Sequence, residues 1–124
     1  MLKHEKFHLI DSQDAVIGNP AYDLASLIDD VRFKTSNNFK KAMFNHFTKK
    51  FLNKDLEKFE NDFLILSVLR NFKILGIFSR LAKRDNKNRY LKYIPYTWSL
   101  IKLRTKNGKV FDELRLILNN NKFI

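Results

Sequence analysis

The pattern of apolar and polar residues predicts a mainly α chain. Apolar side chains recur three or four positions apart over most of the sequence, which is the spacing of one helical face. Five helical segments follow from this spacing: 20–33, 38–52, 55–83, 90–103 with an interruption or a new start at Pro95, and 110–118. One short strand is predicted over residues 7–10, an apolar run that ends at a polar cluster. We therefore expect a short β element followed by four or five helices.

Turn residues separate these segments. Gly18, Asn19 and Pro20 predict a turn that places Pro20 at the first position of a helix. A carboxylate in the first helical turn is favourable with the helix dipole, and Asp23 stands there. The polar run 85–88 predicts the end of the third and longest helix. The sequence contains no repeat of fixed period.

The predicted helices carry three faces that need interpretation. An apolar stripe at intervals of four on the second helix is interpreted as core packing: Phe39, Met43, Phe47 and Phe51. Asn71 falls on the apolar arc of the third helix and is either a hydrogen-bonded core amide, which we favour, or a substrate contact. A basic stripe opposite this arc is either a solvated face or a surface that attracts an anionic partner: Arg70, Lys73, Arg80, Arg84 and Lys87.

The charge is unevenly distributed along the chain. The 124 residues include 24 basic and 13 acidic side chains, a net charge of +11. Residues 1–33 carry a net charge of −3, whereas residues 34–124 carry +14. A strongly basic body is typical of proteins that bind nucleic acid or anionic membrane surfaces. Abundant Lys and Asn can also reflect an AT-rich genome, so the charge alone does not assign a function.

Several functional classes are excluded by the composition. The chain has no Cys, which rules out disulfides, thiol catalysis and zinc–thiolate sites. The apolar runs are far shorter than the roughly 20 residues that span a bilayer, and the N-terminus lacks a signal-peptide pattern. His4, His8 and His46 show no spacing that suggests a metal site or nucleophilic catalysis. We expect a soluble cytoplasmic protein.

One segment carries a specific motif. Residues 9–15 read Leu-Ile-Asp-Ser-Gln-Asp-Ala, and residues 18–27 read Gly-Asn-Pro-Ala-Tyr-Asp-Leu-Ala-Ser-Leu. This motif resembles the metal-binding segment of the aminoglycoside phosphotransferase and choline kinase family, relatives of protein kinases. The resemblance is closest to the bacterial sugar-kinase branch, the N-acetylmuramate/N-acetylglucosamine kinases, which also have segments similar to residues 70–81 and 89–98. It implies the C-terminal helical part of a protein-kinase-like C-lobe, with a strand and metal-site loop at 1–19 and a helical subdomain at 20–124.

The resemblance gives roles to three aspartates. Asp11 would bind the Mg²⁺ that bridges the phosphates of ATP, although spacing alone would favour an ordinary turn carboxylate there. Asp14 would bind the same metal through water or stabilise the loop. Asp23 would have a structural role near the site, holding the loop by hydrogen bonds or capping the helix, without touching the substrate.

Other parts that such a kinase requires are not found in the sequence. A Gly-rich phosphate loop and a catalytic base precede the metal aspartate in these enzymes, whereas ten residues precede Asp11 and the chain has three glycines. Ser12 stands where the family usually has a bulky apolar residue. We therefore expect a truncated phosphotransferase, a decayed reading frame or half of a split enzyme, which is inactive alone. The ancestral activity would be ATP-dependent phosphorylation of a sugar or aminoglycoside hydroxyl.

Two further hypotheses remain open at this point. A small basic helical protein could bind nucleic acid, but the sequence has no recognisable helix-turn-helix and no RNA-binding pattern of aromatic and basic residues. An active enzyme in its own right is the other hypothesis. An incomplete domain should expose apolar surface, so we also expect self-association.

Overall fold

Five α-helices make up most of the structure, a computed structural model that describes residues 2–3, 6–7, 17–51 and 55–120. In chain order the helices are α1 (Ala21–Ile28), α2 (Asn37–Phe51), α3 (Leu56–Asp85), α4 (Ile94–Thr105) and α5 (Asp112–Asn120). Two short 3₁₀ helices, η1 (Asn88–Tyr93) and η2 (Lys109–Phe111), precede α4 and α5. The prediction of a mainly α fold with four or five helices is confirmed.

The β element is a hairpin instead of the expected single strand. β1 (Leu2–Lys3) and β2 (Lys6–Phe7) pair antiparallel, with Leu2 opposite Phe7. Strands of two residues are too short for an alternating pattern to reveal them. Residues 8–10 of the predicted strand, like the metal-site loop after them, lie outside the described residues.

The helix α1 ends five residues earlier than the apolar spacing predicts. Asp29 leaves the helical conformation, with φ −107° and ψ 37°, and turns its side chain into the interior. Asp30 then forms a tight turn, in which its carboxylate accepts a hydrogen bond of 2.8 Å from the Arg32 backbone N–H. The apolar residues of the predicted helix 20–33 therefore do not form one buried face. Val31 is buried after the turn, while Leu27 is exposed on the helix.

The helix α2 has the predicted bounds to within one residue, but a different face is buried. Phe44, Met43 and Phe47 pack against the core, whereas Phe39 and Phe51 are exposed. The buried residue of this helix is Lys40, which forms an ion pair with Asp29. The interpretation of the four-residue stripe as core packing is therefore wrong at its two ends, because the buried face of the helix contains Lys40 and leaves Phe39 and Phe51 exposed.

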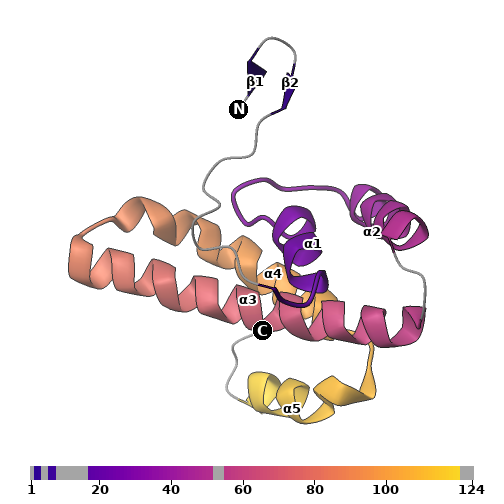
Figure 1. Cartoon of the computed structure of the whole chain (residues 1–124). Coiled ribbons are helices and arrows are strands. Elements are labelled where there is room, and N and C mark those ends of the chain that lie inside the picture. The colour runs from indigo at the N-terminus through magenta and orange to yellow at the C-terminus, as the bar shows by residue number, and fades with distance from the viewer. Residues whose placement is uncertain (1, 4–5, 8–16, 52–54, 121–124) are drawn as a thin grey trace.

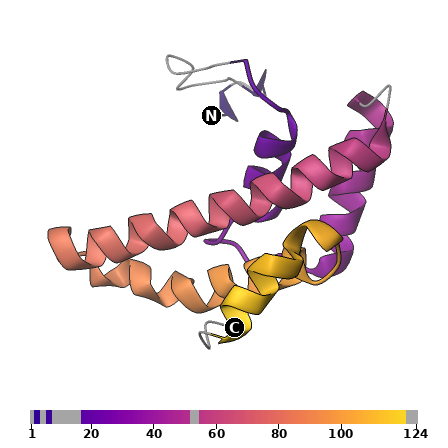
Figure 2. The same ribbon diagram turned by 90° about the horizontal axis from the view of Figure 1, so that it is seen from below.

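The helix α3 is the central element, and its 30 residues extend about 45 Å. The Asp55 side chain caps its first turn by accepting a hydrogen bond of 3.0 Å from the Lys58 N–H. It ends in the predicted polar run, where Asn86 has a left-handed backbone conformation (φ 54°). Figures 1 and 2 both show η1 and α4 returning along α3 in the opposite direction, and Figure 1 shows α5 below this pair.

Two apolar clusters hold the helices together. The first joins α1 to the start of α3: Ala21, Leu24, Ala25, Ile28, Phe59 and Phe63. The second lies toward the other end of α3 and consists of Val31, Phe78 and Leu100. Within the described ranges, no helix is both long enough and apolar enough to cross a membrane.

Candidate functional site

The aspartates predicted to bind metal, Asp11 and Asp14, lie outside the described residues, and their role stays a prediction. The third aspartate, Asp23, is exposed in the first turn of α1. Among the described residues no group of three or more His, Cys, Asp or Glu side chains is placed to hold a metal ion.

The residue that fastens the start of α1 is Asn19. Its Oδ1 accepts a hydrogen bond of 2.9 Å from the Ala21 N–H, and its Nδ2 donates one of 2.7 Å to Oδ2 of Asp62 on α3. The turn between the predicted metal-site loop and α1 is thereby tied to the central helix. Asn19 thus anchors this turn, while the structural role expected of Asp23 stays a prediction.

A buried charge network centres on Asp29, whose side chain is fully inaccessible to solvent. The Asp29 carboxylate accepts hydrogen bonds from Arg104 Nε (2.7 Å) and Nη2 (2.8 Å), from Lys40 Nζ (3.0 Å) and from Ser67 Oγ (2.7 Å). The end of α1 is therefore connected to α2, α3 and α4 at one point. Because two cations surround one carboxylate, the network carries a positive charge.

The electrostatics of this network favour the ionised carboxylate. Burial acts to raise the pKa of Asp29, but the hydrogen bonds and charges of Arg104, with help from Ser67 and Lys40, hold the pKa below its ordinary value. Two backbone carbonyl groups accept further hydrogen bonds from cationic side chains. Lys40 Nζ donates to Ile28 O at 2.7 Å, and Arg70 Nη1 donates to Asp29 O at 3.2 Å.

Asn71 lies beside this network and is fully buried. Its Nδ2 donates a long hydrogen bond of 3.4 Å to Ser67 Oγ, while its Oδ1 has no hydrogen-bond partner among the described residues. The structure thus places Asn71 in the interior, as favoured from the sequence, but the amide is only half satisfied. Its side chain does not line the pocket described next.

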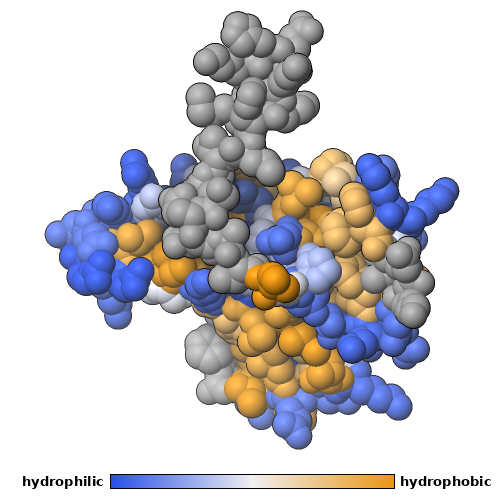
Figure 3. Space-filling view, in the orientation of Figure 1, coloured by the Kyte–Doolittle hydropathy of each residue, from blue (hydrophilic) through white to orange (hydrophobic). Residues whose placement is uncertain are grey.

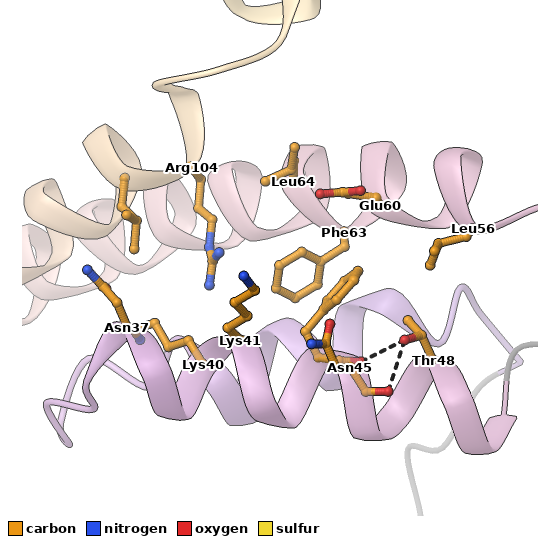
Figure 4. A pocket seen from close by; sticks show the side chains of 12 residues that line it. Asn37, Lys40, Lys41, Asn45, Thr48, Leu56, Glu60, Phe63, Leu64 and Arg104 are labelled. Atoms are coloured by element: carbon orange, nitrogen blue, oxygen red, sulfur yellow. Dashed lines mark hydrogen bonds between the residues drawn. The ribbon is translucent and has the colours of Figure 1, made fainter.

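A pocket of about 460 Å³ opens between α2, the first half of α3 and α4. Figure 4 shows Arg104 and Lys41 reaching into it from opposite sides, with Phe63 forming part of the wall. Amide and hydroxyl groups come from α2: Asn37, Asn45 and Thr48. Lys40 and Arg104 also line it, so the pocket has the Asp29 network as its inner wall.

No pattern in the sequence indicates this network. Lys40 and Arg104 are 11 and 75 positions from Asp29, and each stands within a stretch of other basic residues. A charged residue that is to be buried has no local pattern of its own, since its burial depends on partners brought by other helices.

Comparison with known proteins finds relatives that share one name. A protein of Caulobacter vibrioides is 37% identical over 90 residues, which are 73% of this chain and 25% of the relative. Proteins of Neisseria meningitidis and Pseudomonas aeruginosa are 32% and 33% identical over 101 residues, 77% of this chain and 30% of each relative. All three are named N-acetylmuramate/N-acetylglucosamine kinase.

No family model matches the chain. The chain spans about a quarter to three tenths of the length of these relatives. Over about three quarters of its own length, the chain is related in sequence to sugar kinases.

Proposed function

We propose that these 124 residues form one part of an enzyme that transfers phosphate from ATP to a hydroxyl group of an amino sugar. The observation that carries this proposal is the similarity to three proteins named as N-acetylmuramate/N-acetylglucosamine kinases, over about three quarters of the chain. The motif around Asp11 and Asp14 supplies the matching chemistry, since such a reaction needs carboxylates near the phosphates.

In this proposal Asp11 holds a Mg²⁺ ion, with Asp14 acting through water or supporting the loop. Carboxylate oxygens are the ligands that Mg²⁺ prefers, so the donor chemistry fits. The ion, when bound, neutralises charge on the phosphates of the nucleotide. The described residues hold both ends of α1, the helix that follows the motif: Asn19 donates a hydrogen bond to Asp62, and Asp29 binds Lys40 and Arg104.

We also propose that these residues need the remainder of such an enzyme to transfer phosphate. The chain matches about a quarter to three tenths of its relatives. In the phosphotransferase scheme, a phosphate loop and a catalytic base are further requirements. Apolar side chains on and beside α1 support this proposal, because Ile17, Tyr22 and Leu27 are exposed and would be covered by further protein.

A chimera tests the proposal. This chain replaces the matching quarter of the Caulobacter vibrioides kinase, and phosphorylation of N-acetylglucosamine by ATP is measured with the chimera and with the chain alone. We expect the chimera to be active and the chain alone to be inactive. Asp11→Asn in the chimera should lower the rate about a hundredfold or more, because metal charge stabilisation contributes several kcal/mol.

A matched variant controls for the loss of one negative charge. Glu57→Gln removes an exposed carboxylate from the first turn of α3, outside the sequence of the motif, and should leave the rate unchanged. A chimera that melts cooperatively but does not phosphorylate the sugar would contradict the proposal. Full activity in the Asp11→Asn chimera would contradict the role of Asp11.

A further inference from the structure

A second hollow of about 340 Å³ lies beside the turn after α1 and the 3₁₀ helix η1. It is lined by Arg32, Arg89, Tyr90, Lys92 and Tyr93. We propose that this hollow binds an oxyanion, a carboxylate or a phosphate, carried by a sugar-sized ligand. The proposal does not rest on the proposed kinase function, since it concerns binding without nucleotide or metal.

The side chains around the hollow carry an excess of positive charge. Three cations, Arg32, Arg89 and Lys92, line it, and Asp30 neutralises one of them. Figure 3 shows hydrophilic side chains gathered over the end of the molecule where α3 gives way to η1. Like charges held close together repel one another, and an anion between them converts this repulsion into attraction.

The aromatic rings hold the cations in place. Tyr90 and Tyr93 lie against buried Phe78, with ring centroids 5.4 Å and 5.7 Å from its ring. The Arg89 guanidinium lies 5.3 Å from the Tyr90 ring centroid, and Lys92 Nζ lies 5.0 Å from that of Tyr93. Because the rings are anchored in the core, the cations above them lose less freedom on binding than side chains on an open surface.

Arg32 retains donors for a ligand. Its Nε and Nη2 donate to the two Asp30 oxygens at 3.1 Å and 2.8 Å, which fixes the plane of the guanidinium. A guanidinium has five N–H donors, so the edge that includes Nη1 remains for an oxyanion. The phenols and rings of Tyr90 and Tyr93 add hydroxyl groups and an apolar wall suited to a sugar ring.

Titration of the full chain with three probes tests the proposal. The probes are inorganic phosphate, N-acetylmuramate and N-acetylglucosamine, and the readout is the NMR chemical shift of backbone amides. The two sugars differ by one lactyl ether, which carries the carboxylate. We expect saturable shifts at Arg32 and residues 88–93 with phosphate or N-acetylmuramate, and none with N-acetylglucosamine.

Two double variants distinguish this site from general attraction to a basic protein. Arg89→Gln with Lys92→Gln should weaken binding about tenfold, as expected for the loss of two charge-assisted contacts near the surface. Lys49→Gln with Lys50→Gln also removes two cations, one of them over an aromatic ring, but at the end of α2, and should leave the affinity unchanged.

The outcomes are distinct. Phosphate binding alone assigns the hollow to phosphorylated ligands, and N-acetylmuramate binding alone assigns it to carboxylated sugars. The proposal is overturned if neither anion gives saturable shifts at these residues, if N-acetylglucosamine binds as tightly as N-acetylmuramate with no response to phosphate, or if both double variants lose affinity equally.

Discussion

Replacing Asp29 by Asn tests whether the buried charge network holds the helices together. The substitution keeps the size of the side chain and removes its charge. Lys40 and Arg104 then remain in the interior without a counterion, with side chains only 5% and 14% exposed. Three other helices are fastened to the end of α1 through this carboxylate, so the loss should affect the whole fold and not one helix.

The magnitude follows from the burial of the two cations. Removing one partner of a buried ion pair costs about 3–5 kcal/mol. The cost should be near the lower end, about 3 kcal/mol, because Lys40 and Arg104 also line the pocket between α2 and α4, where water can reach them. A domain of this size is stable by about 5–15 kcal/mol. The variant should therefore fold, with much of its stability lost.

Urea denaturation followed by far-ultraviolet circular dichroism measures this effect. With a slope of about 2 kcal/mol per molar urea, a loss of about 3 kcal/mol moves the midpoint by about 1.5 M. Ser67→Ala removes one donor to the same carboxylate and should cost about 1.5 kcal/mol. It provides a milder measurement should Asp29→Asn not fold.

The control is an arginine–aspartate pair at the surface. Arg84 donates to both oxygens of Asp85 at 2.7 Å and 3.3 Å, and the two side chains are 67% and 25% exposed, far more than Lys40 and Asp29. Asp85→Asn should leave the midpoint unchanged, because water and salt screen such a pair. Equal midpoints for Asp29→Asn and Asp85→Asn would refute the reasoning that burial makes the Asp29 network important.

The pH dependence gives an independent check on Asp29. Its pKa in the folded chain lies below the ordinary value of 3.8, so the unfolded chain binds the proton more readily. The stability that Asp29 contributes is therefore fully present above about pH 5 and is lost as the pH falls below 3.8 toward the folded pKa. The difference in unfolding free energy between the natural chain and Asp29→Asn should be constant at neutral pH and should shrink in this acidic range.

Three further predictions concern other parts of the fold. Phe78→Ala should cost about 3–4 kcal/mol in urea denaturation, because it removes the buried ring beneath Tyr90 and Tyr93; a cost below about 1 kcal/mol would contradict this packing. Asn71→Leu should leave the thermal midpoint unchanged or raise it, since it removes a buried acceptor that has no partner among the described residues; a large drop would show that the amide is satisfied. The chain should self-associate with rising concentration in sedimentation velocity, and Leu116→Glu should reduce this association because Leu116 is an exposed apolar residue of α5. A monomer at all concentrations would contradict the last prediction.

Local patterns predicted the helices well because each helix is long enough to show its own spacing. The bounds of α2 and α3 lie within two residues of those predicted from the apolar spacing and from the polar run 85–88. The end of α1 could not be predicted in this way. Ile28 and Val31 keep a helical spacing across the point where Asp29 turns inward, so the reason for the break lies in residues from three other helices.

The candidate site could be predicted from the sequence only in part, for the same reason. The motif around Asp11 is a run of neighbouring residues, which is why it can be recognised from the sequence alone. The Asp29 network and the hollow at Arg32 join residues 11 to 75 positions apart, among many similar charges. Nothing in a local window distinguishes Lys40, which is buried, from Lys41, which is exposed. Only the packing of α2 against the end of α1 makes them different.

The uneven distribution of charge along the sequence is partly explained by ion pairs inside the fold. Asp29 belongs to the acidic residues 1–33, yet it binds Lys40 and Arg104 of the basic residues 34–124. Part of the charge asymmetry therefore contributes to folding, because a carboxylate from one part and two cations from the other are buried together. Asp30 neutralises Arg32, but Arg89 and Lys92 in the same hollow have no carboxylate beside them among the residues that line it. Two cations of this hollow are therefore left for a ligand to neutralise, and a bound anion would provide the missing negative charge.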